Sequence, residues 1–124
     1  MSALDHSDAN TLMRIGPHPR IAVEVAGDHG PLLLFLHGIG GHRGNWRRQL
    51  AAFGGKYRAA AWDARGYGDS DDDERPLQFT DFCDDLARVI RALGGPAHLV
   101  GLSMGGRIAL EFQARYPDMV ASLT

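Results

Sequence analysis

The sequence has one cysteine, no long apolar segment and almost no net charge. Cys83 has no second cysteine with which to form an intrachain disulfide, which favours a reducing, cytoplasmic compartment. The longest apolar run is Leu32–Leu36, whereas a transmembrane helix needs about 20 apolar residues. Thirteen Lys and Arg residues stand against 15 Asp and Glu, a net charge of −2, so no basic surface for nucleic acid is expected. These absences predict a soluble protein that binds neither a membrane nor nucleic acid.

Residues 1–10 carry no Lys or Arg and no apolar stretch, so we do not expect a secretory signal and predict a flexible tail there. Beyond them, short apolar segments alternate with amphipathic ones, and glycine is abundant at 16 of 124 residues. This alternation predicts an α/β fold with a mostly parallel sheet flanked by helices. Strands are expected at 11–15, 20–26, 32–36, 57–62, 97–102 and 120–124. Helices are expected at 46–53, with Asn45 as the N-cap, from Thr80 as N-cap to residue 93, and at 104–116.

The hexapeptide GLSMGG at residues 101–106 lies between an expected strand and an expected helix. Its G-x-S-x-G pattern is typical of a nucleophile elbow, in which a serine occupies a tight, strained turn and only small residues fit beside it. Such a serine is exposed beside a helix N-terminus, whose dipole favours developing negative charge. The pattern also arises by chance in glycine-rich loops, but its setting between a strand and a helix predicts Ser103 as a nucleophile.

A glycine-rich loop, HGIGGHRG at residues 37–44, directly follows the apolar run Leu32–Leu36. Acyl transfer needs two backbone N–H donors that bind the oxyanion, one from the residue after the nucleophile and one from an earlier loop. Met104 and Ile39 are the candidates for these donors, and His37 and Gly38 border the site. Taken alone, the segment is equally typical of an ordinary turn.

A third segment, DARGYGDS at residues 63–70, follows the expected strand 57–62. Arg65 can bind carboxylates or carbonyls with its rigid guanidinium, so Arg65 and Asp63 are predicted to stabilise this loop and not to take part in catalysis. Trp46 either lines an acyl pocket or packs in the core, and Cys83 is predicted to be a core residue. The acidic run 69–74 is predicted to be a solvated loop.

These three segments, in this order and at expected strand ends, resemble the serine esterase and lactonase branch of the α/β-hydrolase family. The similarity covers residues 21–124 and is greatest to enzymes of the 3-oxoadipate enol-lactonase type and related carboxylesterases. It implies that Ser103 is the nucleophile, that the N–H groups of Ile39 and Met104 form the oxyanion hole, and that no cofactor is used. Relatives that use an aspartate nucleophile, the dehalogenases and epoxide hydrolases, fit less well because residue 103 is a serine.

The sequence departs from this family where a general base is needed. The family's order is Ser, then Asp or Glu, then His, yet no histidine follows Ser103. The acids that follow, Glu111 and Asp118, are expected to lie far from the elbow. His37 and His42 border the site but are not expected to replace the base, and with no suitable partner ligands they do not predict a metal site.

We therefore expect residues 11–124 to be the N-terminal half of a serine α/β-hydrolase, apparently truncated and inactive alone. The intact enzyme would act on a small carboxylic ester or lactone. The alternatives are a C–C bond hydrolase or perhydrolase of the same fold, or a non-catalytic ligand-binding form. An unpaired sheet edge at residues 120–124 further predicts self-association or pairing with a complementary C-terminal segment.

Overall fold

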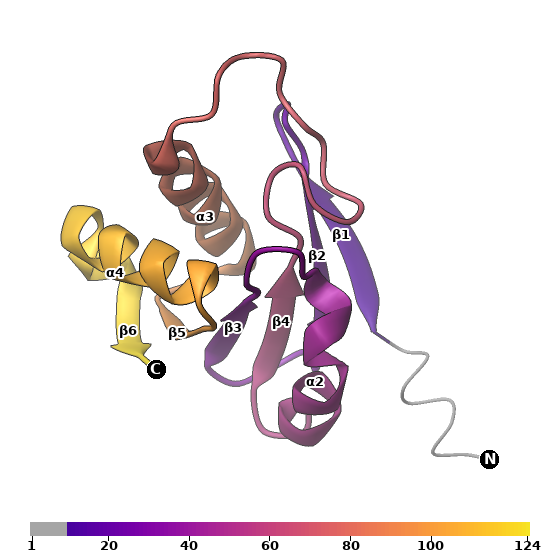
Figure 1. Cartoon of the computed structure of the whole chain (residues 1–124). Helices are drawn as coiled ribbons and strands as arrows, with labels where there is room; N and C mark the ends of the chain where they lie inside the picture. Colours follow the sequence, from indigo (N-terminus) through magenta and orange to yellow (C-terminus); the bar gives the residue numbers. More distant parts are fainter. Residues whose placement is uncertain (1–9) are drawn as a thin grey trace.

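The computed structural model describes residues 10–124, which form one six-stranded sheet covered by helices (Figure 1). Of the tail expected over residues 1–10, only Asn10 is among the described residues, and its amide donates a hydrogen bond to Glu24 at 3.0 Å. The strands are β1 (Thr11–Ile15), β2 (Ile21–Ala26), β3 (Leu32–Leu36), β4 (Arg58–Trp62), β5 (Ala97–Gly101) and β6 (Val120–Leu123).

The sheet is mixed, with the strand order β1-β2-β4-β3-β5-β6. Strand β3 runs parallel to β4 and β5, and β5 runs parallel to β6, whereas β1, β2 and β4 are joined by antiparallel pairs. The expected mostly parallel sheet is thus confirmed, with an antiparallel hairpin at one edge. The apolar run Leu32–Leu36 forms the strand between β4 and β5. Side chains pack on both faces of the sheet at this strand, which explains why the run has no polar position.

The helical segments begin and end close to the expected positions, but two expected N-caps are wrong. Helix α3 begins one residue before Thr80, and Gln78 is the N-cap, with its N–H donating to Asp81 at 2.9 Å. Asn45 lies inside a 3₁₀ turn, where its side chain accepts the N–H of His42 at 2.9 Å. No helix in the described part of the chain is long and apolar enough to cross a membrane. The helical segments are η1 (Arg43–Trp46), α2 (Arg47–Phe53), α3 (Phe79–Leu93), α4 (Met104–Arg115) and η2 (Pro117–Met119).

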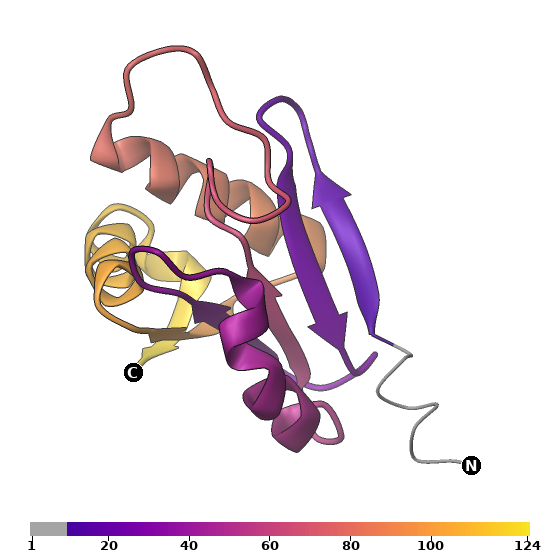
Figure 2. The same ribbon diagram turned by 45° about the vertical axis from the view of Figure 1, so that its right-hand side comes forward.

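The helices cover both faces of the sheet, with α3 and α4 on one face and α2 on the other (Figures 1 and 2). Successive side chains of a strand point to opposite faces, so β3 contributes to both layers. Leu34 and Leu36 pack towards α3 and α4, and Phe35 packs towards α2 and Leu50.

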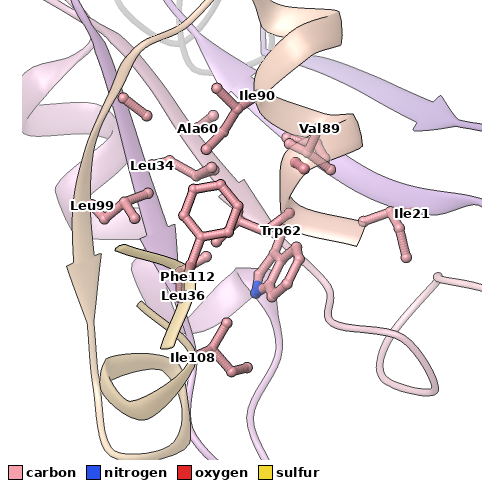
Figure 3. Packing of buried hydrophobic residues seen from close by; sticks show 14 of the residues in the cluster. Ile21, Leu34, Leu36, Ala60, Trp62, Val89, Ile90, Leu99, Ile108 and Phe112 are labelled. Atoms are coloured by element: carbon pink, nitrogen blue, oxygen red, sulfur yellow. The ribbon is translucent and has the colours of Figure 1, made fainter. Parts of the chain in front are cut away.

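The larger core lies beneath α3 and α4. Trp62 of β4 is fully buried there, and Figure 3 shows it beside Ile108 and Phe112 of α4 and Val89 of α3. Cys83 is buried in the same cluster, as expected, and burial raises the pKa of its thiol to about 11. The complete burial of Cys83 confirms the predicted packing role, and a raised pKa keeps the thiol mostly protonated at neutral pH.

The parallel register brings the carboxyl ends of β3, β4 and β5 to the same edge of the sheet. Phe35 pairs with Ala61, and Leu36 pairs with Gly101. The three segments that the sequence singles out follow these strand ends. They therefore meet at one edge of the sheet although 26 to 64 residues separate their starting positions, 37, 63 and 101.

Candidate active site

Ser103 occupies the tight turn between β5, which ends at Gly101, and α4, which begins at Met104. Its φ is 55° and its ψ is −113°, and it is the one non-glycine residue of the described chain with a positive φ. Such a conformation is unfavourable for a residue with a Cβ and persists only where the surroundings enforce it. Ser103 is exposed, so the strained turn presents its hydroxyl to solvent at the end of the strand.

Three glycines make this turn sterically possible. A Cβ at Gly101 would lie 2.5 Å from the nitrogen of Gly106, and a Cβ at Gly105 would overlap the carbonyl group of Leu36. A Cβ at Gly38 would lie 3.3 Å from the Cβ of Ser103. The elbow therefore packs directly on the end of β3 and on the loop that follows it.

That loop, residues 37–44, is called the oxyanion loop here and carries the predicted donor Ile39. The N–H of Gly41 bonds the carbonyl of Gly38 at 3.0 Å, and Ile39 at the resulting turn is 79% exposed. An added Cβ at Gly38 would come within 3.3 Å of the Ser103 Cβ, and Met104 directly follows Ser103. The backbone segments that carry the two predicted donors therefore both lie near the serine.

His37 is buried and links the oxyanion loop to the loop after β4. Its Nε2 accepts the N–H of Ala64 at 3.1 Å, which leaves the proton on Nδ1, from which it bonds the carbonyl of Gly38 at 2.8 Å. Burial lowers the pKa of His37 below 6.5, so the neutral ring is favoured. Both ring nitrogens are occupied, and the imidazole is not available as a base for Ser103.

The loop at residues 63–70, called the arginine loop here, is organised by the fully buried Asp63. The Asp63 carboxylate accepts the N–H of Arg43 at 2.7 Å and that of Asp69 at 2.9 Å, and its carbonyl accepts the hydroxyl of Ser70 at 2.5 Å. A Cβ at Gly68 would overlap this carboxylate. Asp63 thus connects its own loop to the oxyanion loop.

Arg65 lies in the same loop and binds α3. Its Nε and one terminal nitrogen bond the two carboxylate oxygens of Asp85 at 2.9 and 2.8 Å, and Arg88 bonds Asp85 at 2.7 Å. The hydrogen bonds to Asp85 raise the pKa of Arg65. This contact joins the arginine loop to a helix and leaves Arg65 without a direct contact to Ser103.

Arg43 is a site residue that the sequence reasoning missed. Its guanidinium bonds Asp63, Asp69 at 2.8 Å and Glu24 at 3.2 Å. Burial opposes its charge, but the hydrogen bonds to Asp69 and Asp63 are stronger in effect and raise the pKa of Arg43. The sequence signal that could have pointed to Arg43 is that it is the one Lys or Arg in the oxyanion loop. The loop sequence does not indicate which carboxylates Arg43 binds.

The acidic run 69–74 differs in part from the expected solvated loop. Asp69, Asp71 and Asp73 bind arginines of other segments, as shown by the contacts of Asp71 with Arg20 at 3.2 Å and of Asp69 with Arg43. Arg20 directly precedes β2, Arg43 begins η1 and Arg65 lies in the arginine loop, so these ion pairs join the acidic run to other segments. Asp69, Asp72 and Glu74 are exposed, as expected of a solvated loop.

Trp46 packs on the α2 face of the sheet. Its ring stacks on that of Phe35 with centroids 4.9 Å apart, and its indole nitrogen is buried without a hydrogen-bond partner in the described residues. The stacking gives Trp46 a packing role. Lining of an acyl pocket by Trp46 stays a prediction.

Within residues 10–124, no side chain forms a hydrogen bond with the Ser103 hydroxyl. His42 uses its Nδ1 to accept the N–H of Gly44 at 3.0 Å. Glu111 is on the exposed side of α4, about 12 Å along the helix axis from Ser103, and Asp118 lies beyond the helix end. The same described residues contain no group of three or more His, Cys, Asp or Glu side chains able to hold a metal ion.

Residues 31–124 match the family model described as the alpha/beta hydrolase fold, and the chain therefore belongs to this family. Among curated proteins it is 39% identical over 95 residues to 2-(acetamidomethylene)succinate hydrolase of Mesorhizobium japonicum, covering 76% of this chain and 34% of that protein. It is 38% identical over 104 residues to epoxide hydrolase 1 of Caenorhabditis elegans, with coverages of 82% and 26%. It is 34% identical over 92 residues to 3-oxoadipate enol-lactonase 1 of Acinetobacter baylyi, with coverages of 73% and 34%.

The structural comparison agrees with the family assignment. The crystal structure of E-2-(acetamidomethylene)succinate hydrolase superposes with a TM-score of 0.86 and 34% identity, covering 92% of this chain and 43% of that one. The chain thus spans about a third of the length of the curated relatives that it matches. The three curated relatives named above are hydrolases, and one of them is an enol-lactonase, the type that the sequence resembles.

Proposed function

We propose that this chain supplies the nucleophile and the oxyanion hole of a serine hydrolase that acts on a carboxylic ester or lactone. The observation that carries the proposal is the positive φ of Ser103 at a strand–helix turn. Gly38 of the oxyanion loop is so near that an added Cβ would lie 3.3 Å from the Ser103 Cβ. A strained, exposed serine beside a glycine-rich loop is the arrangement that acyl transfer requires.

In the proposed reaction the Ser103 hydroxyl attacks the carbonyl carbon of the substrate. The carbonyl oxygen becomes an oxyanion and accepts hydrogen bonds from the N–H groups of Ile39 and Met104. The alcohol part of the ester, or the ring oxygen of the lactone, leaves with a proton, and the acyl group stays on Ser103. Water then attacks the acyl-enzyme and releases the acid.

The attack needs a base to accept the serine proton, and the described residues offer none. His37 has both ring nitrogens occupied, and His42 caps a 3₁₀ turn. We therefore infer that the base and its orienting acid come from a complementary segment or from a partner chain. The 124-residue chain alone is expected to be inactive.

The substrate class is supported by the relatives' names. One relative is an enol-lactonase and another hydrolyses 2-(acetamidomethylene)succinate, and the elbow of this chain has serine. The epoxide hydrolases among the relatives do not favour epoxide chemistry here, since the resemblance places an aspartate nucleophile in such enzymes. A C–C bond hydrolase or perhydrolase would use the same serine, and a ligand-binding form would keep the site without turnover.

The test measures release of p-nitrophenol from a p-nitrophenyl ester. The isolated chain should give no burst, and addition of the base-bearing segment or partner should give hydrolysis that Ser103→Ala abolishes. Intact-mass spectrometry of the reaction should find the acyl group on Ser103. Arg47→Ala, an exposed change at the start of α2, is the matched control and should retain activity.

The possible results separate the proposals. A burst from the isolated chain that Ser103→Ala abolishes would overturn the predicted inactivity. Hydrolysis that survives Ser103→Ala would exclude the serine mechanism. Tight binding of an ester without any product would favour a ligand-binding form, and acceptance of peroxide in place of water would favour a perhydrolase.

A further inference from the structure

We propose that Arg43 is a positioning residue that fixes the oxyanion loop relative to Ser103, through its bonds to the arginine loop. The inference rests on the proposed function, because it concerns the N–H donor carried by that loop. It adds a residue that neither the sequence pattern nor the motifs point to.

The oxyanion loop is attached to the arginine loop at both ends. At its start, the His37 ring accepts the N–H of Ala64 at 3.1 Å. At its end, the Arg43 N–H bonds one Asp63 oxygen at 2.7 Å, and the Arg43 guanidinium bonds the other. The intervening residues include the predicted donor Ile39, which is largely exposed and is held by the loop's ends.

The attachment at Arg43 is stronger than a surface ion pair. Asp63 is fully buried, and only 18% of the Arg43 side chain is exposed. The same guanidinium also reaches Asp69 of the arginine loop and Glu24 of β2, so one side chain joins three segments. Buried, multidentate contacts of arginine restrict the position of both partners more than a single exposed contact does.

The loop in turn passes close to the proposed nucleophile, Ser103. A Cβ at Gly38 would lie 3.3 Å from the Cβ of Ser103 and 3.3 Å from the carbonyl oxygen of Leu102. A shift of the loop end would therefore move the Ile39 N–H relative to the oxyanion. The oxyanion forms only as the reaction proceeds, so binding of the unreacted substrate depends less on this N–H. Loss of position by about 1 Å reduces a rate by about 10²-fold, an effect on kcat more than on KM.

The experiment compares Arg43→Ala, Arg43→Lys and the control Arg47→Ala in the intact enzyme with p-nitrophenyl butyrate. Among the described residues Arg47 forms no ion pair, and it lies four residues after Arg43. Arg43→Ala should lower kcat by about 10²-fold with KM changed by no more than about threefold. Arg43→Lys should recover part of kcat, and Arg47→Ala should match the unchanged enzyme.

Hydrogen exchange gives a second measurement that does not depend on turnover. Arg43→Ala should speed exchange of the amides at residues 38–44 while those of α3 keep their protection. Unchanged exchange in the loop, or a kcat equal to that of Arg47→Ala, would overturn the inference. If Ser103→Ala fails to abolish hydrolysis, the proposed function is wrong, and exchange alone then decides whether Arg43 fixes the loop.

Arg43→Ala leaves the Asp63 carboxylate buried without its cation, so this variant can unfold for that reason alone. The double variant Arg43→Ala/Asp63→Asn removes both charges and keeps an acceptor at position 63. If it folds and shows the same loss of kcat, the positioning role is supported. If it folds with full kcat, the role is excluded.

Discussion

Glycine determines the geometry of this site at single positions. Gly105 lies where α4 begins to pack on the end of β3, and its missing side chain lets the helix backbone approach the carbonyl of Leu36. This close packing stabilises the tight turn at Ser103, whose φ of 55° is unfavourable for a residue with a Cβ. The abundance of glycine in the sequence thus has a steric cause at the elbow.

Gly105→Ala should destabilise the protein strongly, because the added methyl would overlap backbone atoms that cannot move aside. We expect a loss of about 3 kcal/mol or more in the free energy of unfolding, measured by urea denaturation. The matched control is Gly55→Ala, where no atom lies within 4 Å of the new methyl and the change should be within about 0.5 kcal/mol. Equal effects of the two substitutions would contradict this account.

His37 should make stability depend on pH. Burial lowers its pKa below 6.5, so the unfolded chain binds more protons than the folded one just below pH 6.5. The contribution of His37 is therefore complete above pH 6.5 and is lost as the pH falls from there towards the folded-state pKa. Unfolding free energies of the unchanged protein and of His37→Gln should converge on acidification, and NMR should place the His37 titration below 6.5. If the unfolding free energies of the two proteins change with pH in parallel, His37 is not the source of the pH dependence.

At the scale of elements, charged pairs join α3 to the rest of the molecule. Asp85 of α3 is 1% exposed and bonds both Arg65 of the arginine loop and Arg88 of its own helix. Arg88 also bonds the carbonyls of Pro17 and Pro19 in the hairpin between β1 and β2. A single buried carboxylate thereby connects a helix, a loop and a hairpin.

Asp85→Ala should cost about 3 kcal/mol of unfolding free energy. It removes the bidentate partner of the buried Arg65 guanidinium and leaves only the longer ion pairs to Asp73 at 3.6 Å and Asp81 at 3.8 Å. Asp84→Ala, one residue earlier, removes one exposed hydrogen bond to Tyr116 and should cost about 1 kcal/mol or less. Chemical denaturation of both variants measures the difference. A loss for Asp85→Ala no larger than that for Asp84→Ala would show that the pair stabilises little.

At the scale of the whole molecule, one side of the sheet is open. In the described part of the chain β6 pairs with β5 alone, and most of its side chains are exposed. Leu123 of β6 is 37% exposed, and the described surface also has Leu102 and Leu110, which are 58% and 65% exposed. An open strand edge next to exposed apolar side chains favours association with another chain.

The 124-residue chain should therefore self-associate in a concentration-dependent way, measured by size-exclusion chromatography with light scattering. Leu110→Glu should weaken the association, because it places a charge in the apolar surface. Arg115→Glu, an exposed charge change at the end of the same helix, is the control. A monomer at all concentrations with a sharp two-state melt would contradict the prediction.

Most of the secondary structure and the turn at Ser103 could be predicted from the sequence alone. The apolar run Leu32–Leu36, the glycines around Ser103 and the spacing of the three segments are local features, and local features predict strands, helices and the elbow. The two wrong N-caps, Thr80 and Asn45, also concern local features: capping boxes pair Gln78 with Asp81 at the start of α3 and His42 with Asn45 at the start of η1.

The tertiary structure alone decided which charged groups meet. Arg43 and Asp63 are 20 residues apart, Arg65 and Asp85 are 20 apart, and His37 and Ala64 are 27 apart. Side-chain hydrogen bonds have no periodicity along the chain, and their partners become neighbours only when parallel strands bring their ends to one edge. The sequence therefore determined the strained turn at Ser103, and the packing of the sheet determined which side chains bond the oxyanion loop to its neighbours.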